Sequence, residues 1–233
     1  MLRPRQLSLQ IMLDDAATFD NFHVTAANAQ ALDYLRDATH LAQFTWLWGV
    51  QGAGCSHLLQ ALCQQEGHAG GTLYMPLQMH AQFHPEMLEG LEALDMVCLD
   101  DVEHIAGNAD WELALFSLFN RLRDSGTRLL IAGRSAPRQL QVQLPDLLSR
   151  LQLGLVFQVH ELTDEDKIQA LQKRARLRGM DLSEEVAHYV LQRTERSSNG
   201  LFSLLERLDE HSLRTQRRIT IPLVREVFQN DTL

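Results

Sequence analysis

The sequence lacks any apolar run near the roughly 20 residues of a membrane-spanning helix, so no membrane partner is expected. Cysteine is sparse, with three in 233 residues and no metal-ligand spacing between them, which argues against a disulfide framework. Such usage is typical of the reducing cytosol, so a cytoplasmic protein is expected. The first residues contain two Arg but no long apolar block and no small-residue cleavage site, which argues against a secretory signal.

An excess of basic residues is also missing, because 21 Lys and Arg stand against 30 Asp and Glu, giving a formal net charge of −9. Tight, non-specific DNA binding needs clustered Lys and Arg, so this composition argues against it. Hydrophobic residues make up 45% of the chain and charged residues 22%, the balance of a globular protein with a core. The length fits one large domain, or a large and a small one.

Short apolar segments alternate with helical patterns over the first two-thirds of the chain. Strands are expected at 44–48, 72–76, 96–99, 128–132 and 155–159. Helices are expected at 28–41, 56–65 and 109–124. Because apolar strands that alternate with helices are typical of a sheet covered on both faces, the pattern predicts an α/β fold with a parallel sheet.

The pattern changes after His160. Amphipathic helices without a strand are expected at 164–178, 183–193 and 198–215, with a last short helix from Pro222. We therefore expect an extended tail at 1–13, an α/β domain at 14–160 and a small all-helical domain at 161–233.

The glycine-rich segment 49–57 lies between an expected strand and an expected helix. It has the frame of a phosphate-binding loop, G-x-x-x-x-G-K-[ST], in which backbone N–H groups and a helix N-terminus bind phosphate oxygens. Cys55 stands where the pattern has Lys, and Ser56 supplies the hydroxyl that binds Mg²⁺. The expected nucleotide-binding residues are Gly49, Gly52, Ala53, Gly54, Cys55, Ser56 and His57. Taken alone, the segment is equally well interpreted as a turn without a ligand.

A second motif strengthens the nucleotide interpretation. An apolar strand ends in Asp100 and Asp101, about 45 residues after the loop, in the order that a P-loop NTPase requires. Asp100 is expected to hold Mg²⁺ through water, and Asp101 to orient an attacking water. The missing lysine normally reaches the β- and γ-phosphates, so we expect a preference for ADP over ATP and weak or absent hydrolysis by the chain itself. Arg134 is a candidate replacement cation.

These motifs resemble a known family. Residues 14 to 229 resemble the AAA+ module of the bacterial replication initiator DnaA. The residues that carry this resemblance are segments 18–22, 56–59 and 99–102, together with Asn28. A second resemblance, to the Hda family of DnaA-homologous regulatory inactivators, is closer still. It is carried by segments 6–9, 137–140, 162–167, 174–179 and 219–222. The resemblance implies an AAA+ P-loop NTPase fold with a helical lid. It also implies a negative regulator of replication initiation that works with ADP bound, sits on the DNA-loaded sliding clamp and stimulates hydrolysis of DnaA-bound ATP.

The resemblance also assigns roles to residues. It implies that Arg150 is an arginine finger acting in trans, that Phe22 and Val24 lie beside the adenine, and that Asn199 replaces the sensor arginine of the lid. Core packing explains the residue types at positions 22 and 24 equally well. The clamp-binding peptide would comprise Gln6, Leu7, Leu9 and Ile11. The implied partners are DnaA and the clamp, with DNA reached only through the clamp, and self-association is left open.

Two other functions fit the motifs. One is a self-sufficient P-loop ATPase, against which Cys55 and Asn199 count. The other is an accessory loader of the replicative helicase, for which no clamp-binding peptide is expected. The Arg174, Arg176 and Arg178 cluster is interpreted as a solvated helix face, and the scattered histidines, His104 among them, show no metal-ligand spacing.

Overall fold

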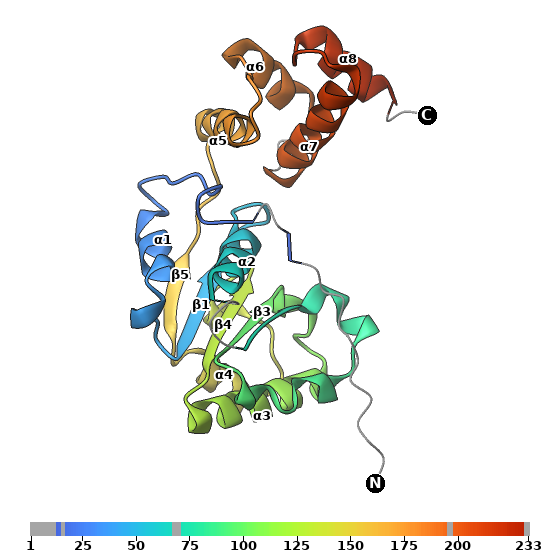
Figure 1. Ribbon diagram of the computed structural model, residues 1–233. Helices are drawn as coiled ribbons and strands as arrows, with labels where there is room; N and C mark the ends of the chain where they lie inside the picture. The colour runs from blue at the N-terminus through green and yellow to red at the C-terminus, as the bar shows by residue number, and fades with distance from the viewer. Residues whose placement is uncertain (1–12, 15–16, 67–70, 195–197, 231–233) are drawn as a thin grey trace.

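The computed structural model describes residues 13–14, 17–66, 71–194 and 198–230. An α/β part and a group of helices that follows it lie one beyond the other, joined by a single passage of chain after the last strand (Figure 1). No helix in the described ranges is long and apolar enough to cross a membrane.

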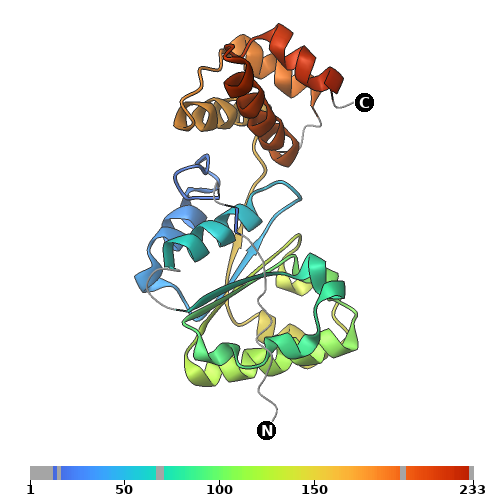
Figure 2. The same ribbon diagram turned by 45° about the vertical axis from the view of Figure 1, so that its right-hand side comes forward.

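The centre of the α/β part is a sheet of five parallel strands in the order β2-β3-β4-β1-β5. The strands are β1 (Phe44–Trp48), β2 (Thr72–Pro76), β3 (Met96–Asp100), β4 (Arg128–Gly133) and β5 (Leu155–Gln158). One face is covered by α1 (Ala29–Arg36) and α2 (Cys55–Glu66), and the other by α3 (Ala109–Ser125) and α4 (Pro145–Leu151) (Figure 2). The predicted parallel sheet is confirmed. Its inner strands β1, β3 and β4 are apolar because helices bury both faces, whereas the edge strand β5 is largely exposed.

Some elements differ from the prediction. The helix expected over 28–41 ends at Arg36 and is followed by a 3₁₀ turn, Ala38–His40. The Asp37 carboxylate accepts hydrogen bonds from Thr39 N and Oγ1, at 3.2 and 2.6 Å, and such local bonds compete with the helical ladder. The segment between β2 and β3, for which no element was predicted, forms the 3₁₀ turns Leu77–Gln82, Pro85–Leu88 and Leu91–Ala93.

The C-terminal part, here called the lid, contains α5 (Asp164–Leu177), α6 (Glu184–Arg193), α7 (Ser198–Thr215) and α8 (Ile221–Asn230). Its helices pack around an apolar core of their own, which includes Leu171, Val190 and Leu223. Helix α5 begins with a capping box, in which Thr163 Oγ1 accepts from Asp166 N and the Asp166 carboxylate accepts from Thr163 N. The lid is therefore a separately packed layer next to the α/β part.

A buried amide fixes the passage from β5 to the lid. Asn28 is fully buried, and its side chain accepts from His160 N at 2.8 Å and donates from Nδ2 to His160 O at 2.9 Å. Both polar groups of the amide are thus satisfied by one residue of the connecting segment. This pair holds the start of α1 against the chain at the point where it leaves the sheet.

A buried carboxylate fixes the start of α4. Glu112 of α3 is 1% exposed and accepts from Gly107 N at 2.6 Å, Gln143 N at 2.9 Å and Leu144 N at 2.8 Å. Leu144 is the residue that precedes the first turn of α4. The carboxylate thus joins α3 to the helix that carries Arg150.

We expect Glu112→Ala to lower the free energy of unfolding by about 3–5 kcal/mol, because it leaves three backbone N–H groups without a charged acceptor. Urea denaturation measures the change. The matched control is Glu89→Ala, which removes an exposed carboxylate and is expected to change stability by at most about 0.5 kcal/mol. Equal midpoints for the two variants would contradict the role assigned to Glu112.

Candidate functional site

The loop between β1 and α2 has the backbone that its glycines predict. Gly52 and Gly54 have φ values of 85° and 107°, a region that L side chains rarely adopt. A Cβ atom at Gly54 would also lie 2.8 Å from the Phe22 ring. Helix α2 begins at Cys55, so the free N–H groups of its first turn adjoin the loop. This is the arrangement in which a loop and a helix N-terminus bind an anion.

Two cavities flank the loop. The lid-side cavity, of about 330 Å³, reaches from the loop to α5 and α7, and the sheet-side cavity, of about 290 Å³, reaches from the loop to the ends of β3 and β4. The predicted residues that line both cavities are Gly52, Gly54, Ser56 and His57. The predicted residues Phe22 and Ala53 line the first cavity alone, and Gly49, Cys55, Asp100 and Asp101 line the second alone.

The other predicted residues differ in what the structure says of them. The Val24 side chain is 44% exposed and lines neither cavity. Asn199 lies in the first turn of α7, but its side chain is outside the part that the structure describes. The four clamp-binding residues Gln6, Leu7, Leu9 and Ile11 also lie outside the described residues.

The sheet-side cavity contains two adjacent carboxylates. Asp100 is buried, and its carboxylate accepts from Tyr74 Oη at 2.7 Å and from the Asp101 N–H at 2.9 Å, and it is also hydrogen-bonded to Ser56. Burial raises the pKa of Asp100. Burial and then the Asp100 charge raise the pKa of Asp101 to about 6. Because two such carboxylates and a hydroxyl are hard oxygen ligands, Ser56, Asp100 and Asp101 fit a magnesium ion.

No cation replaces the missing lysine at its own position. The Cys55 side chain is 9% exposed, and burial, together with the Asp100 charge, raises the pKa of its thiol to about 12. The thiol is therefore neutral at physiological pH. Arg134 lines the sheet-side cavity, but its Nε lies 2.9 Å from Glu103 Oε1, so much of its charge is neutralised by that carboxylate.

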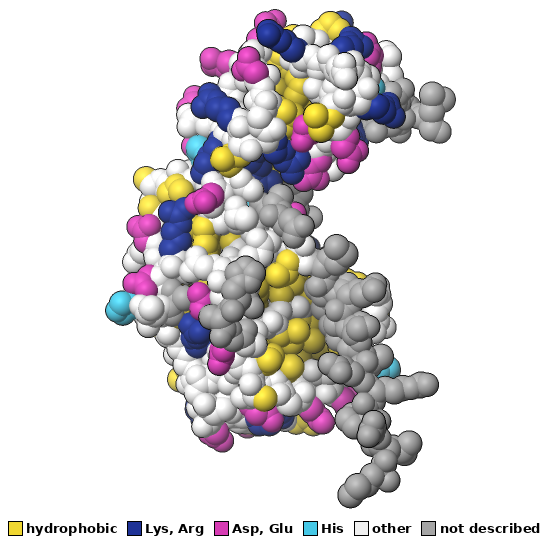
Figure 3. All heavy atoms as spheres, viewed as in Figure 1, with side chains coloured by type: hydrophobic (Ala, Val, Ile, Leu, Met, Phe, Trp, Pro, Cys, Tyr) yellow, Lys and Arg dark blue, Asp and Glu magenta, His cyan; other side chains and the backbone are white. Residues whose placement is uncertain are grey.

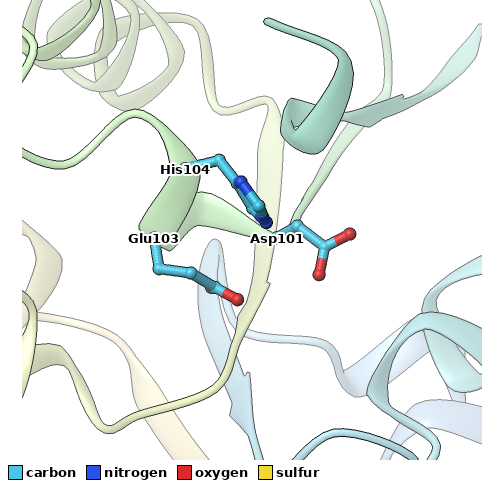
Figure 4. A group of neighbouring side chains, drawn as sticks. All are labelled: Asp101, Glu103 and His104. Carbon is cyan, nitrogen blue, oxygen red and sulfur yellow. The ribbon is translucent and has the colours of Figure 1, made fainter.

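A further group of potential metal ligands lies just after β3. One ligand atom each from Asp101, Glu103 and His104 lies within 4.8 Å of the others. Figure 4 shows the His104 ring beside Asp101, with both residues in the turn that follows the strand. Spacing along the chain does not indicate this grouping, because only the 3₁₀ turn Val102–His104 brings residues 101, 103 and 104 to one side.

The lid-side cavity contains His57, and the hydrogen-bond partners of this histidine determine its tautomer. His57 Nε2 lies 2.7 Å from Thr18 O, and Nδ1 lies 3.0 Å from Arg174 Nη2. A carbonyl oxygen only accepts and a guanidinium only donates, so Nε2 carries the proton and Nδ1 accepts. Burial, more than any other cause, lowers the pKa of His57 to about 4, so the ring is neutral at physiological pH.

Arg174 corrects the interpretation of the basic cluster on α5. Its guanidinium carbon lies 3.6 Å from the centre of the Phe202 ring, and the side chain lines the lid-side cavity. Burial lowers the pKa of Arg174 to about 10, which leaves the group charged at pH 7. Arg176 and Arg178 are exposed, as predicted. The sequence does not distinguish Arg174 from Arg176 and Arg178, because the three charges alternate along one helix and only the packing of the lid determines which one faces the loop.

Arg150 lies at the opposite end of the sheet from the loop. Strands β1 and β5 pair in parallel, with Thr45 opposite Leu155 and Trp48 opposite Gln158. The loop follows the carboxyl end of β1, whereas Arg150 precedes the amino end of β5. At about 3.3 Å per residue, the length of β5 alone separates them by roughly 13 Å. Arg150 is partly exposed as a residue, and its guanidinium forms no hydrogen bond or ion pair with any residue in the described ranges.

Two family models and several solved structures match the chain. Residues 13–158 match the model of the bacterial DnaA ATPase domain, and residues 164–228 match the model of the Hda lid domain. Domain III of the replication initiation protein DnaA from Thermotoga maritima superposes with a TM-score of 0.75 at 22% identity, covering 94% of this chain and 98% of that one.

DnaA from Aquifex aeolicus, in a structure bound to AMPPCP, matches with a TM-score of 0.67 at 24% identity, covering 84% of this chain and 66% of that one. The Holliday junction branch migration motor RuvB from Thermotoga maritima matches with a TM-score of 0.65 at 14% identity, covering 91% of this chain and 73% of that one. These similarities confirm the AAA+ fold with a helical lid, and the match over 13–158 spans more than half of the chain. The chain therefore belongs to the bacterial DnaA ATPase domain family, as a Hda- and DnaA-related AAA+ protein.

Proposed function

We propose that this protein is a negative regulator of replication initiation that completes the active site of another molecule. Held on the DNA-loaded sliding clamp, it stimulates hydrolysis of the ATP bound to DnaA and so leaves inactive DnaA-ADP. The observation that carries the proposal is the position of Arg150, which is partly exposed and a strand's length away from the loop of its own chain. Such an arginine is available to a neighbouring molecule and not to its own phosphate site.

Arg150 acts in trans as an arginine finger. Its guanidinium stabilises the charge that develops on the transferred phosphoryl oxygens, an effect worth about 10³–10⁵ in rate in other NTPases. The planar fork of donors matches phosphate oxygens, which Lys does not. Glu112 supports this role, because it fixes the start of the helix on which Arg150 lies.

The chain's own site binds an adenine nucleotide, with ADP preferred, and hydrolyses it weakly or not at all. The loop with α2 binds the phosphates, Phe22 lies beside the base, and Asn199 offers an uncharged contact from the lid. Magnesium, when bound, neutralises phosphate charge, and Ser56, Asp100 and Asp101 hold it. The AMPPCP complex of the Aquifex DnaA supports this assignment, and the neutral Cys55 supports the bias against the triphosphate.

The tail at 1–13 brings the protein to the clamp through Gln6, Leu7, Leu9 and Ile11. In this arrangement, residues 14–160 form the nucleotide-binding domain and 161–233 the lid. A short docking peptide binds with modest affinity, so several equivalent sites on a ring increase retention. DNA is contacted only through the clamp, which agrees with the acidic composition.

We expect Arg150→Ala to lower the stimulated hydrolysis of DnaA-bound ATP by at least about a hundredfold while ADP binding is unchanged. The measurement is phosphate release in a reconstitution of DnaA-ATP, clamp loaded on DNA, and this protein. Arg150→Lys is also expected to be inactive, because it keeps the charge but loses the fork. Arg123→Ala is the control, since it removes an exposed arginine that, like Arg150, shortly precedes the amino end of a strand. Full stimulation by Arg150→Ala would remove this residue from the mechanism.

We expect titration calorimetry with Mg²⁺ present to give a lower dissociation constant for ADP than for ATP, because no lysine at position 55 contacts the γ-phosphate. Cys55→Lys is expected to strengthen binding of ATP more than binding of ADP. Binding of ATP tenfold tighter than ADP by the natural chain would refute the assigned preference.

We expect the double replacement Gln6→Ala, Leu9→Ala to abolish retention on a clamp-loaded column, because it removes the hydrogen bond and the apolar side chain of the docking peptide. Thermal unfolding and ADP affinity serve as controls and are expected not to change. Normal clamp retention by the double variant would exclude the tail as the clamp-binding segment.

A further inference from the structure

The lid-side cavity contains two buried polar atoms without partners. Arg174 Nε and Ser198 Oγ are both inaccessible and have no hydrogen-bond partner among the residues that the structure describes. Ser198 is 5% exposed. A donor that is removed from water without a partner destabilises the fold, so such atoms indicate a place where a ligand completes the hydrogen bonds. Both atoms belong to the lid, one to α5 and the other to the first residue of α7.

Both side chains adjoin the phosphate loop. A Cβ atom at Gly52 would lie 3.6 Å from Ser198 N and 4.0 Å from Ser198 Oγ, so the start of α7 lies directly over the loop. Arg174 Nη2 donates to His57, one residue after Ser56. The space-filling view shows a notch between the two parts of the molecule, with Lys and Arg side chains on the adjoining surface of the lid (Figure 3).

The charge and the buried Nε–H of Arg174 favour a ligand with anionic oxygens at this position. Arg174 is the cation that lines the cavity from the lid, and its Nε–H has no hydrogen-bond partner among the described residues. Two carboxylates also line the cavity: Glu206 lies 2.9 Å from Arg178 Nη2, which neutralises much of its charge, and the charge of Asp14 acts on Arg174 itself. Phe22 and Phe202 add apolar atoms to the lining of the cavity.

We propose that Arg174 and Ser198 are the lid's ligands for the bound nucleotide, and that Arg174 supplies the positive charge that Cys55 and Asn199 do not. This inference rests on the proposed nucleotide site and names the groups that complete it. Arg174 keeps its bond to His57 and donates from Nε to a phosphate oxygen, while Ser198 Oγ donates to a second oxygen. Nucleotide thus holds α5 and the start of α7 against the loop and keeps the lid closed.

The test is titration of the whole chain with MgADP and with adenosine, which has the same base and sugar but no phosphate. Arg174→Gln is expected to weaken MgADP binding about 10- to 100-fold, the range of a charge-assisted hydrogen bond, and to change adenosine binding less than about twofold. Ser198→Ala is expected to weaken MgADP binding about three- to tenfold. The matched control is Arg176→Gln, which removes the same charge from an exposed position of the same helix and is expected to have less than a twofold effect.

The outcomes separate the two proposals. If the natural chain binds MgADP and Arg174→Gln binds it as tightly as Arg176→Gln, the inference is overturned and the nucleotide site stands. If Arg174→Gln weakens adenosine as much as MgADP, Arg174 acts on the shape of the cavity and the phosphate contact is overturned. If the natural chain binds no MgADP at millimolar concentration, the nucleotide site itself fails. Should Arg174→Gln not fold, Arg174→Lys, which lacks Nε–H but keeps the charge, is expected to give an intermediate loss for MgADP alone.

Discussion

The arrangement of the site depends on a neutral histidine between three segments of the chain. His57, in the first turn of α2, donates to Thr18 O and accepts from Arg174 of the lid. Burial keeps the ring neutral by lowering its pKa, and only the neutral ring can do both, because a protonated ring has no acceptor. Lys173 adds a second link between the same helix of the lid and the N-terminal segment, donating to Phe22 O at 2.9 Å. The lid is thus tied to the loop and to the segment that adjoins it.

Positive charge is distributed in an unusual way around the sheet. At the carboxyl ends of the strands, where a P-loop protein has a lysine, this chain has a neutral thiol beside two carboxylates. Arg174 lines the lid-side cavity on the other side of the loop, and Arg150 lies at the other end of the sheet, apart from any described acidic partner. In the proposed function, this site holds a nucleotide for its structural effect, whereas the distant Arg150 acts on a neighbouring molecule. The positions of the two arginines support both parts of the proposal.

The sequence predicts the sheet well because its inner strands β1, β3 and β4 are largely buried and all five strands are short apolar runs between turns. It also predicts the loop, since the φ values at Gly52 and Gly54 require glycine. The sequence does not predict the features that tertiary contacts determine, such as where a helix starts or which side chain faces the loop. Helix α4 starts where the Glu112 carboxylate binds Leu144 N, a contact across 32 positions, and Arg174 faces the loop only because the lid packs there. Val24 is 44% exposed and lines neither cavity, so its predicted contact with the base stays a prediction.

The central claim is that this chain donates catalytic help to a partner and uses none itself. A single-turnover experiment tests it most directly. Labelled ATP is loaded either on DnaA or on this protein, the second protein is added with the DNA-loaded clamp, and phosphate release is followed from each site. The account predicts rapid release only when the label starts on DnaA. Release that is equally fast from the site of this protein alone would contradict it, because a loop with Cys55 in place of lysine would then be a working ATPase.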